Sequence, residues 1–272
     1  MEKQNIVEQA RQCFDPILHT DEYRRIHGDA SHLDALMNFL DVRPNKRYLD
    51  LGTGNGYLAF EMAHRFPDIA VTGIDIAVRS IQINQKLSRE QGIKNLGFIS
   101  YTGIQFPFRD TLFGGVISRY AFHHFPDTTI SVQELYRITE TQGFVIISDP
   151  ITYEADTVGF IDQFQQLKPN GHVHFFRAPE LDALFQRYGF TREAQFLSAI
   201  SYSRDVNEAY MHLLEKTPTS ILEKYCIELR EKAVHVTVTV MNVLYRKIGK
   251  QIRAGCKMEK RLPPLLADHL GP

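Results

Sequence analysis

The chain has 272 residues, 43% of them hydrophobic and 23% charged, which excludes a disordered chain and allows two domains or one large α/β domain. Lys and Arg total 31 against 32 for Asp and Glu, and this net charge of −1 argues against nucleic acid as the main partner. There is no apolar run of about 18 residues and no apolar signal-peptide core, so we expect a cytoplasmic protein without a membrane span. Cys13, Cys226 and Cys256 are too widely spaced for a CxxC pair or a disulfide framework.

The first part of the chain, over 1–45, is predicted to be helical, with apolar residues at helical spacing over 31–40. Strands then alternate with helices, and such alternation forms parallel βαβ units in a doubly wound α/β sheet. The predicted strands are 47–51, 69–76, 96–101, 115–119 and 143–149, and the predicted helices between them are 57–66, 78–91 and 129–140.

The pattern loosens after residue 149, where a helix is predicted at 179–188, a sixth strand at 191–202 and a seventh at 234–245. Between the last two strands, the segment 203–233 is predicted to hold two amphipathic helices, around 207–214 and 220–232. Their apolar stripes, the second of which includes Leu229, must be buried against the mouth of a crevice or against a partner subunit.

A glycine-rich turn, Gly52-Thr53-Gly54-Asn55-Gly56, lies directly between the first strand and the following helix. Glycines there allow a tight turn and expose backbone N–H groups to a ligand. Asp75 ends the second strand, 23 residues after Gly52, where its carboxylate can accept both hydroxyls of a ribose or can cap the next helix. The two features together predict an adenosine-containing cofactor at the strand ends.

Four segments carry a family resemblance: YLDLGTGNGYLA, VTGIDIA, FPFRDTLFGGVISRYAFHHFPD and RITETQGFVIISD. They resemble the class I S-adenosylmethionine-dependent methyltransferases, most closely the small-molecule methyltransferases of the ubiquinone/menaquinone-biosynthesis type. The resemblance covers about 20–190 and implies a seven-stranded, mostly parallel, Rossmann-like sheet. The stretch 19–27 resembles the cofactor-covering lid of this family, so a helical N-terminal lid is expected over 1–45; the alternative for 19–27 is an ordinary surface helix. A methyltransferase domain is expected over 46–253, and the residue pattern adds the helical insertion 203–233 and a tail over 254–272.

The resemblance also implies S-adenosylmethionine as cofactor and S-adenosylhomocysteine as product. Asp50 would hold the methionine ammonium group, Asp75 the ribose hydroxyls, and Ile76 would pack on the adenine. The full set of residues expected at the cofactor is Asp50, Gly52, Thr53, Gly54, Asn55, Gly56, Asp75, Ile76, Thr102, Gly103, Ile104 and Arg119.

The acceptor side is predicted from residues that follow the fourth and fifth strands. His123 and His124 are the candidate catalytic bases, because histidine titrates near neutral pH; alternatively they pack or cap the helix near Asp127. His172 and His174 could join them around a metal, but no acidic residue has diagnostic spacing, so we expect no metal. The residues expected at the acceptor are Tyr23, Tyr120, His174 and Phe175.

The predicted function is in-line methyl transfer to a small, apolar or aromatic acceptor, which the 18 Phe and 12 Tyr residues suit. The alternative is a catalytically inactive or non-methylating S-adenosylmethionine-binding protein of the same fold, because Thr102 and Gly114 stand where the family favours acidic residues. The insertion 203–233 would either line the acceptor pocket or form a homodimer interface.

Overall fold

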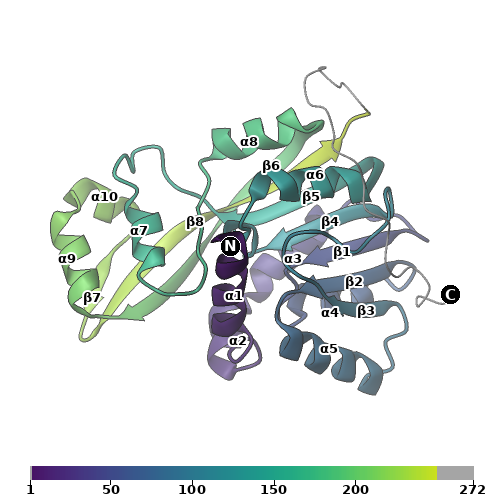
Figure 1. The fold of residues 1–272 in the computed structure, drawn as a ribbon, viewed down its shortest axis with the longest axis horizontal. Helices are drawn as coiled ribbons and strands as arrows, with labels where there is room; N and C mark the ends of the chain where they lie inside the picture. The colour runs from purple at the N-terminus through teal and green to yellow at the C-terminus, as the bar shows by residue number, and fades with distance from the viewer. Residues whose placement is uncertain (1, 250–272) are drawn as a thin grey trace.

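A single mixed sheet forms the centre of the protein in this computed structural model, which describes residues 2–249 (Figure 1). Its strands are β1 (Arg47–Leu51), β2 (Ala70–Asp75), β3 (Leu96–Ser100), β4 (Phe113–Arg119), β5 (Thr139–Pro150), β6 (Phe190–Asp205), β7 (Glu228–Arg230) and β8 (Ala233–Lys247). The order is β3-β2-β1-β4-β5-β8-β6, and the short β7 pairs with β8. The first five strands are parallel, whereas β8 is antiparallel to both β5 and β6. The predicted doubly wound, mostly parallel sheet is thus confirmed.

Helices cover both faces of this sheet (Figure 1). They are α1 (Glu2–Phe14), α2 (Asp21–His27), α3 (Ala30–Phe39), α4 (Tyr57–Arg65), α5 (Val78–Glu90), the 3-10 helix η1 (Phe122–His124), α6 (Thr128–Ile138), α7 (Phe160–Gln166), α8 (Ala178–Arg187), α9 (Glu208–Lys216) and α10 (Thr219–Lys224). No helix among these residues has the length and apolar character needed to cross a membrane. The predicted tail 254–272, with Cys256, lies outside the described residues.

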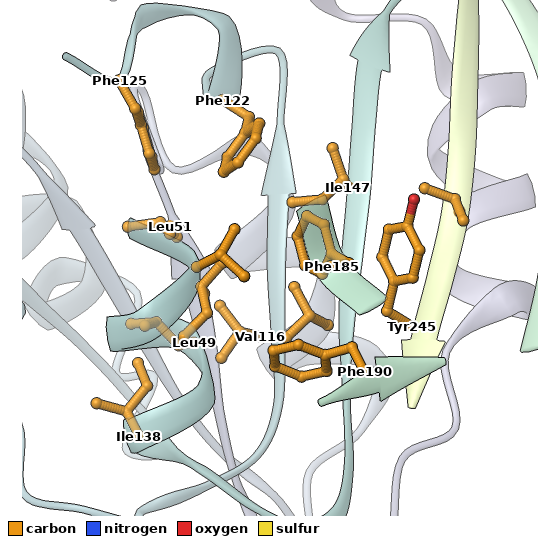
Figure 2. Packing of buried hydrophobic residues seen from close by; sticks show 14 of the residues in the cluster. Leu49, Leu51, Val116, Phe122, Phe125, Ile138, Ile147, Phe185, Phe190 and Tyr245 are labelled. Carbon is orange, nitrogen blue, oxygen red and sulfur yellow. The ribbon is translucent and has the colours of Figure 1, made fainter. Parts of the chain in front are cut away.

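Two hydrophobic cores hold the helices against the sheet. On one face, α6 and α8 pack on the strands, and the Phe185 ring stacks on Tyr245 with centroids 4.1 Å apart (Figure 2). On the other face, α3, α4 and α5 bury Leu36, Met62 and Ile81. Each such side chain contributes about 1.5–3 kcal/mol on burial. This packing sets the positions of the strand ends that carry the polar residues discussed below.

A third core lies apart from the sheet centre, where the distal part of the β6–β8 hairpin packs with α7, α9 and α10. We call these elements, 156–168 and 200–238, the arm; it extends to the left in Figure 1. Its centre is Phe164, which lies against Phe160 and Tyr210 with ring centroids 5.7 and 4.8 Å away. The insertion 203–233 is therefore an integral part of this arm.

The predicted helix over 220–232 is wrong beyond Lys224. The chain turns at Cys226, forms β7, and returns into β8 through Glu231, which has a left-handed φ of 51°. Leu229 then pairs with Val234 in the ladder and is 52% exposed, so it is no part of a buried helical stripe. Pairing with the long neighbouring strand satisfies backbone groups here, which helical periodicity cannot reveal.

Candidate active site

A cavity of about 560 Å³ opens at the carboxyl ends of β1, β2 and β4, against α1 and α2. Many of the predicted site residues line it: Tyr23, Asp50, Gly52, Thr53, Gly54, Asn55, Asp75, Ile76, Gly103, Arg119, Tyr120 and His124. Six others lie outside its lining: Gly56, Thr102, Ile104, His123, His174 and Phe175. The structure thus gathers residues from the N-terminal helices and three strand ends around one space.

The glycine turn is pressed against the loop that follows β4. Gly52 has a φ of 76°, and a Cβ atom there would lie 2.4 Å from the Cβ of Ala121. The Gly52 and Thr53 amides both donate to the Ile74 carbonyl oxygen, at 2.9 and 3.0 Å. Only glycine fits this approach, so the turn leaves its backbone beside the cavity.

Two buried carboxyl groups flank the turn. The Thr53 hydroxyl donates to Asp50 Oδ2 at 2.7 Å, and burial, reinforced by Asp75, raises the pKa of Asp50 to about 7. Asp75 accepts the Gly54 amide on Oδ2 (2.8 Å) and the Ala77 amide on Oδ1 (2.9 Å), and burial raises its pKa also. A cation or hydroxyl donors in the cavity would stabilise both ionised carboxylates.

Arg119, at the end of β4, ties the sheet to the N-terminal helices. Its Nη2 donates to the His27 carbonyl oxygen at 2.8 Å, and its Nε donates to His32 Nδ1 at 3.3 Å. The guanidinium lies 4.3 Å from the Tyr120 ring centroid and 5.3 Å from that of Tyr57. Its position at the cavity wall suits the binding of an anionic group.

His32 is a site residue that sequence analysis missed. Its buried ring donates from Nε2 to Asn242 Oδ1 at 2.9 Å, so Nδ1 is left to accept the Tyr120 hydroxyl at 3.2 Å. Tyr120 itself has a left-handed φ of 55°, a conformation that costs about 1–3 kcal/mol and is concentrated at functional sites. The only signal in the sequence was a histidine beside Leu33 on an otherwise apolar helix face.

His123 forms a buried pair with Asp149, a second residue that sequence analysis missed. The His123 amide donates to Asp149 Oδ2 at 2.9 Å, and its ring Nδ1–H donates to Oδ1 at 2.9 Å. Burial lowers the pKa of His123 well below 6.5, so the ring is neutral at pH 7. Among residues 2–249 nothing hydrogen-bonds Nε2, which leaves this atom as a proton acceptor. The available signal was an acidic residue at the carboxyl end of β5.

His124 lies next to this pair, with its ring centroid 4.1 Å from that of His123 and 5.0 Å from that of Phe14. Burial also lowers the pKa of His124 well below 6.5. Its Nδ1 is buried without a partner in the described part of the chain. Both histidines therefore titrate below the near-neutral range expected from their residue type.

The second histidine cluster is organised by an aspartate. His172 Nε2 and His174 Nδ1 each donate to Asp162 at 2.7 Å, and this pairing raises the pKa of His174. Phe175 is buried in the core of the arm. Within the described residues, no group of three or more His, Cys, Asp and Glu side chains is arranged to hold a metal ion. The His172 ring lies 6.2 Å from that of His124 between centroids, so this cluster packs behind the cavity wall.

The insertion 203–233 contributes no residue to the cavity lining. Its apolar side chains, Tyr210, Ile221 and Tyr225, pack instead against α7 in the arm. Sequence analysis allowed the insertion to line the acceptor pocket. In the structure, α1 and α2 line the cavity on that side.

The sheet order, the glycine turn and the acidic strand ends define a class I, S-adenosylmethionine-dependent methyltransferase fold. A family described as "Methyltransferase domain" matches residues 43–216. The chain belongs to this methyltransferase family, as its sequence resemblance implied.

Relatives agree with this assignment. The uncharacterized methyltransferase YcgJ of Bacillus subtilis is 25% identical over 162 residues, covering 59% of this chain and 63% of the relative. The ubiquinone/menaquinone biosynthesis C-methyltransferase UbiE of Geotalea daltonii is 26% identical, covering 53% and 59%. The chain thus spans less than two thirds of the length of these curated relatives. The crystal structure of YcgJ shares the fold, with a TM-score of 0.70 at 19% identity over 81% of this chain and 99% of that one.

Proposed function

We propose that this protein transfers a methyl group from S-adenosylmethionine to a small acceptor with an apolar or aromatic body. The observation that carries the proposal is the pair of buried carboxyl groups, Asp50 and Asp75, on either side of the close glycine turn in one cavity. Asp75 accepts backbone N–H groups of Gly54, Ile76 and Ala77, and we assign its remaining acceptor capacity to the hydroxyls of a ribose. We assign the ammonium group of the methionine moiety to Asp50, whose ionised form this cation would stabilise. The residues present therefore fit this cofactor.

The bound cofactor supplies an electrophilic methyl group on a sulfonium, and the protein must position the acceptor and exclude water. We assign exclusion of water to α1 and α2, which close one wall of the cavity. Where the acceptor carries an O–H or N–H group, its proton would pass to a histidine of η1. The candidates are His124, which lines the cavity, and the adjacent His123 Nε2 behind it, whose imidazolium Asp149 would stabilise.

The apolar character of the acceptor is supported by the side chains that line the cavity on the N-terminal side. Five of them are apolar and come from α1, the turn after it and the loop after η1: Val7, Ala10, Phe14, Leu18 and Phe125. Tyr23 adds an aromatic ring, stacked on His27 at 4.0 Å between centroids. An apolar wall of this kind suits the apolar body of a small acceptor. UbiE, by its name, acts in quinone biosynthesis, which is consistent with a small acceptor.

The Asp75→Ala variant tests the cofactor assignment. Removal of two charged hydrogen bonds should weaken S-adenosylhomocysteine binding at least tenfold, because each such bond contributes about 1.5–3 kcal/mol. Calorimetry measures this affinity, and transfer of label from methyl-labelled S-adenosylmethionine to a panel of acceptors measures activity. Asp68→Ala, in the turn before β2, is the matched control. Equal affinity in the Asp75 variant and the wild type would refute the site, and labelled cofactor with no labelled acceptor would favour a non-methylating role.

A further inference from the structure

Two cations of the arm, Arg204 and Lys168, lie together beside the cavity. Arg204 is on β6, on the same face as Tyr202, and its guanidinium lies 4.5 Å from the Tyr202 ring centroid. The Tyr202 hydroxyl is hydrogen-bonded by Gln165 of α7, and the Lys168 amide donates to the Gln165 carbonyl oxygen at 3.1 Å. This chain of contacts brings the end of α7 next to Arg204, and both cations are half-buried.

No carboxylate among residues 2–249 forms an ion pair with either cation. Arg204 Nη1 donates to the Ser203 carbonyl oxygen at 3.0 Å, the Tyr210 hydroxyl hydrogen-bonds its side chain, and its Nε is buried without a partner. Burial and repulsion by Arg204 lower the pKa of Lys168, opposed by Cys13 and Glu22. Two like charges held close together in a partly desolvated site repel each other, and a bound anion would relieve this repulsion.

The pair faces the N-terminal helices that close the cavity. His27 of α2 lines the cavity, and its pKa is lowered by burial and by Arg119, Arg204 and Lys168 together. Arg119 in turn holds the His27 carbonyl oxygen at 2.8 Å. A band of positive charge thus leads from the cavity wall at the end of β4, past His27, to the arm.

We propose that Arg204 and Lys168 bind an anionic group, a carboxylate or a phosphate, carried by the methyl acceptor. The inference rests on the proposed function, and it adds that the acceptor has a charged end opposite its apolar body. Arg204 offers a planar fork of donors that matches a carboxylate or phosphate, and Lys168 adds a point charge. Neither cation lines the cavity, so the anionic end of the acceptor has to extend past His27 to reach the arm.

The test uses the full chain saturated with S-adenosylhomocysteine. One calorimetric titration series adds benzoate, and a second series adds inorganic phosphate. Arg204→Gln and Lys168→Gln are the test variants. Lys224→Gln, which removes an exposed cation from α10 of the same arm, is the matched control. Affinity should fall at least tenfold, about 1.4 kcal/mol, in Arg204→Gln and less in Lys168→Gln, and should be unchanged in the control. Arg204→Lys should recover part of the affinity that Arg204→Gln loses.

Saturable binding of one probe identifies the anion class, and binding of both supports a site for either class. The absence of saturable binding of both probes at millimolar concentrations, or equal affinities in all variants, would overturn the proposal. The affinity for S-adenosylhomocysteine and the thermal melting temperature of each variant are measured first. Unchanged values show that lost anion binding is local to the arm. If the wild type fails to bind S-adenosylhomocysteine, the proposed function fails, and the same titrations on the free protein still decide the anion site.

Discussion

Polar side chains around the cavity are held by partners from distant parts of the sequence. His32 is hydrogen-bonded to Asn242, 210 residues away, and His123 to Asp149, 26 residues away. Both histidines are buried, so their neutral forms and fixed tautomers follow from desolvation and from the acceptor each one faces. At the scale of single residues, the site is a set of buried hydrogen bonds. Loss of one of these bonds should lower the rate of methyl transfer more than the affinity for the cofactor.

The His123–Asp149 pair should act as a unit. His123→Gln removes the proton acceptor, and Asp149→Asn removes the charge that stabilises the imidazolium, so each should lower turnover by about 10²–10⁴-fold on an acceptor with an O–H or N–H group. The double variant should be little slower than either single one. Single-turnover transfer of labelled methyl groups measures the rate. His64→Gln provides a control histidine at another part of the cavity wall. Full activity in both variants would leave the pair with a purely structural role.

His27 should make stability depend on pH. Burial lowers its pKa to about 4, against about 6.5 when unfolded, so below pH 6.5 the unfolded chain binds a proton that the folded chain does not. Stability is therefore lost as the pH falls, by about 2 kcal/mol at pH 5 from this residue. Urea unfolding at pH 7.5 and pH 5 should show a smaller loss for His27→Gln than for the wild type. Equal losses would mean that His27 is not held in its buried position.

At the scale of elements, the arm and the cofactor site are built from different cores. The arm buries apolar side chains of α7, α9 and α10 on the distal β6–β8 hairpin, whereas the cavity lies at the ends of β1, β2 and β4. A short helix such as α10 is marginal alone, so its stability depends on this packing. The charges of Arg204 and Lys168 in the arm act on His27 of α2.

Phe164→Ala should destabilise the arm without weakening cofactor binding. The Phe164 ring is fully buried against Phe160 and Tyr210, and the cavity left by its removal should cost about 3–5 kcal/mol. Urea unfolding measures the loss, and calorimetry with S-adenosylhomocysteine should show nearly unchanged affinity. Leu167→Ala, at a residue 36% exposed just after α7, serves as control and should cost far less. A loss below about 1 kcal/mol for Phe164→Ala would contradict a packed core in the arm.

At the scale of the whole molecule, we also propose that 203–233 forms a homodimer contact. Leu229, 52% exposed on β7 at the edge of the arm, is a large apolar residue available to a second copy. Leu229→Glu should then shift a dimer to monomer in sedimentation experiments, because a desolvated carboxylate is unfavourable at an interface. The monomer should keep its affinity for S-adenosylhomocysteine. A wild-type protein that sediments as a monomer over micromolar concentrations would rule this interface out.

Local pattern was sufficient to predict the α/β alternation, the glycine turn and the family, because these depend on residues close together in the chain. The mostly parallel sheet that the family resemblance implied is confirmed, and the ladder between β5 and β8 shows that β8 is an antiparallel strand in it. The helix predicted over 220–232 failed where β7 pairs with β8, because strand pairing is a contact with a partner outside the local window.

The composition of the site required the tertiary structure. Asp50 and Asp75 could be predicted from their places at strand ends, since parallel strands bring their carboxyl ends to one edge. Asp149 beside His123 could not, because a buried polar pair is specified by the packing of two strands and a loop. Arg204 is on β6 and Lys168 follows the end of α7, and the two cations have no shared spacing in the sequence. Sequence periodicity indicates which face of a helix or strand is apolar. Which polar groups are buried side by side is determined only by the tertiary structure, because it brings together residues that are distant in the sequence.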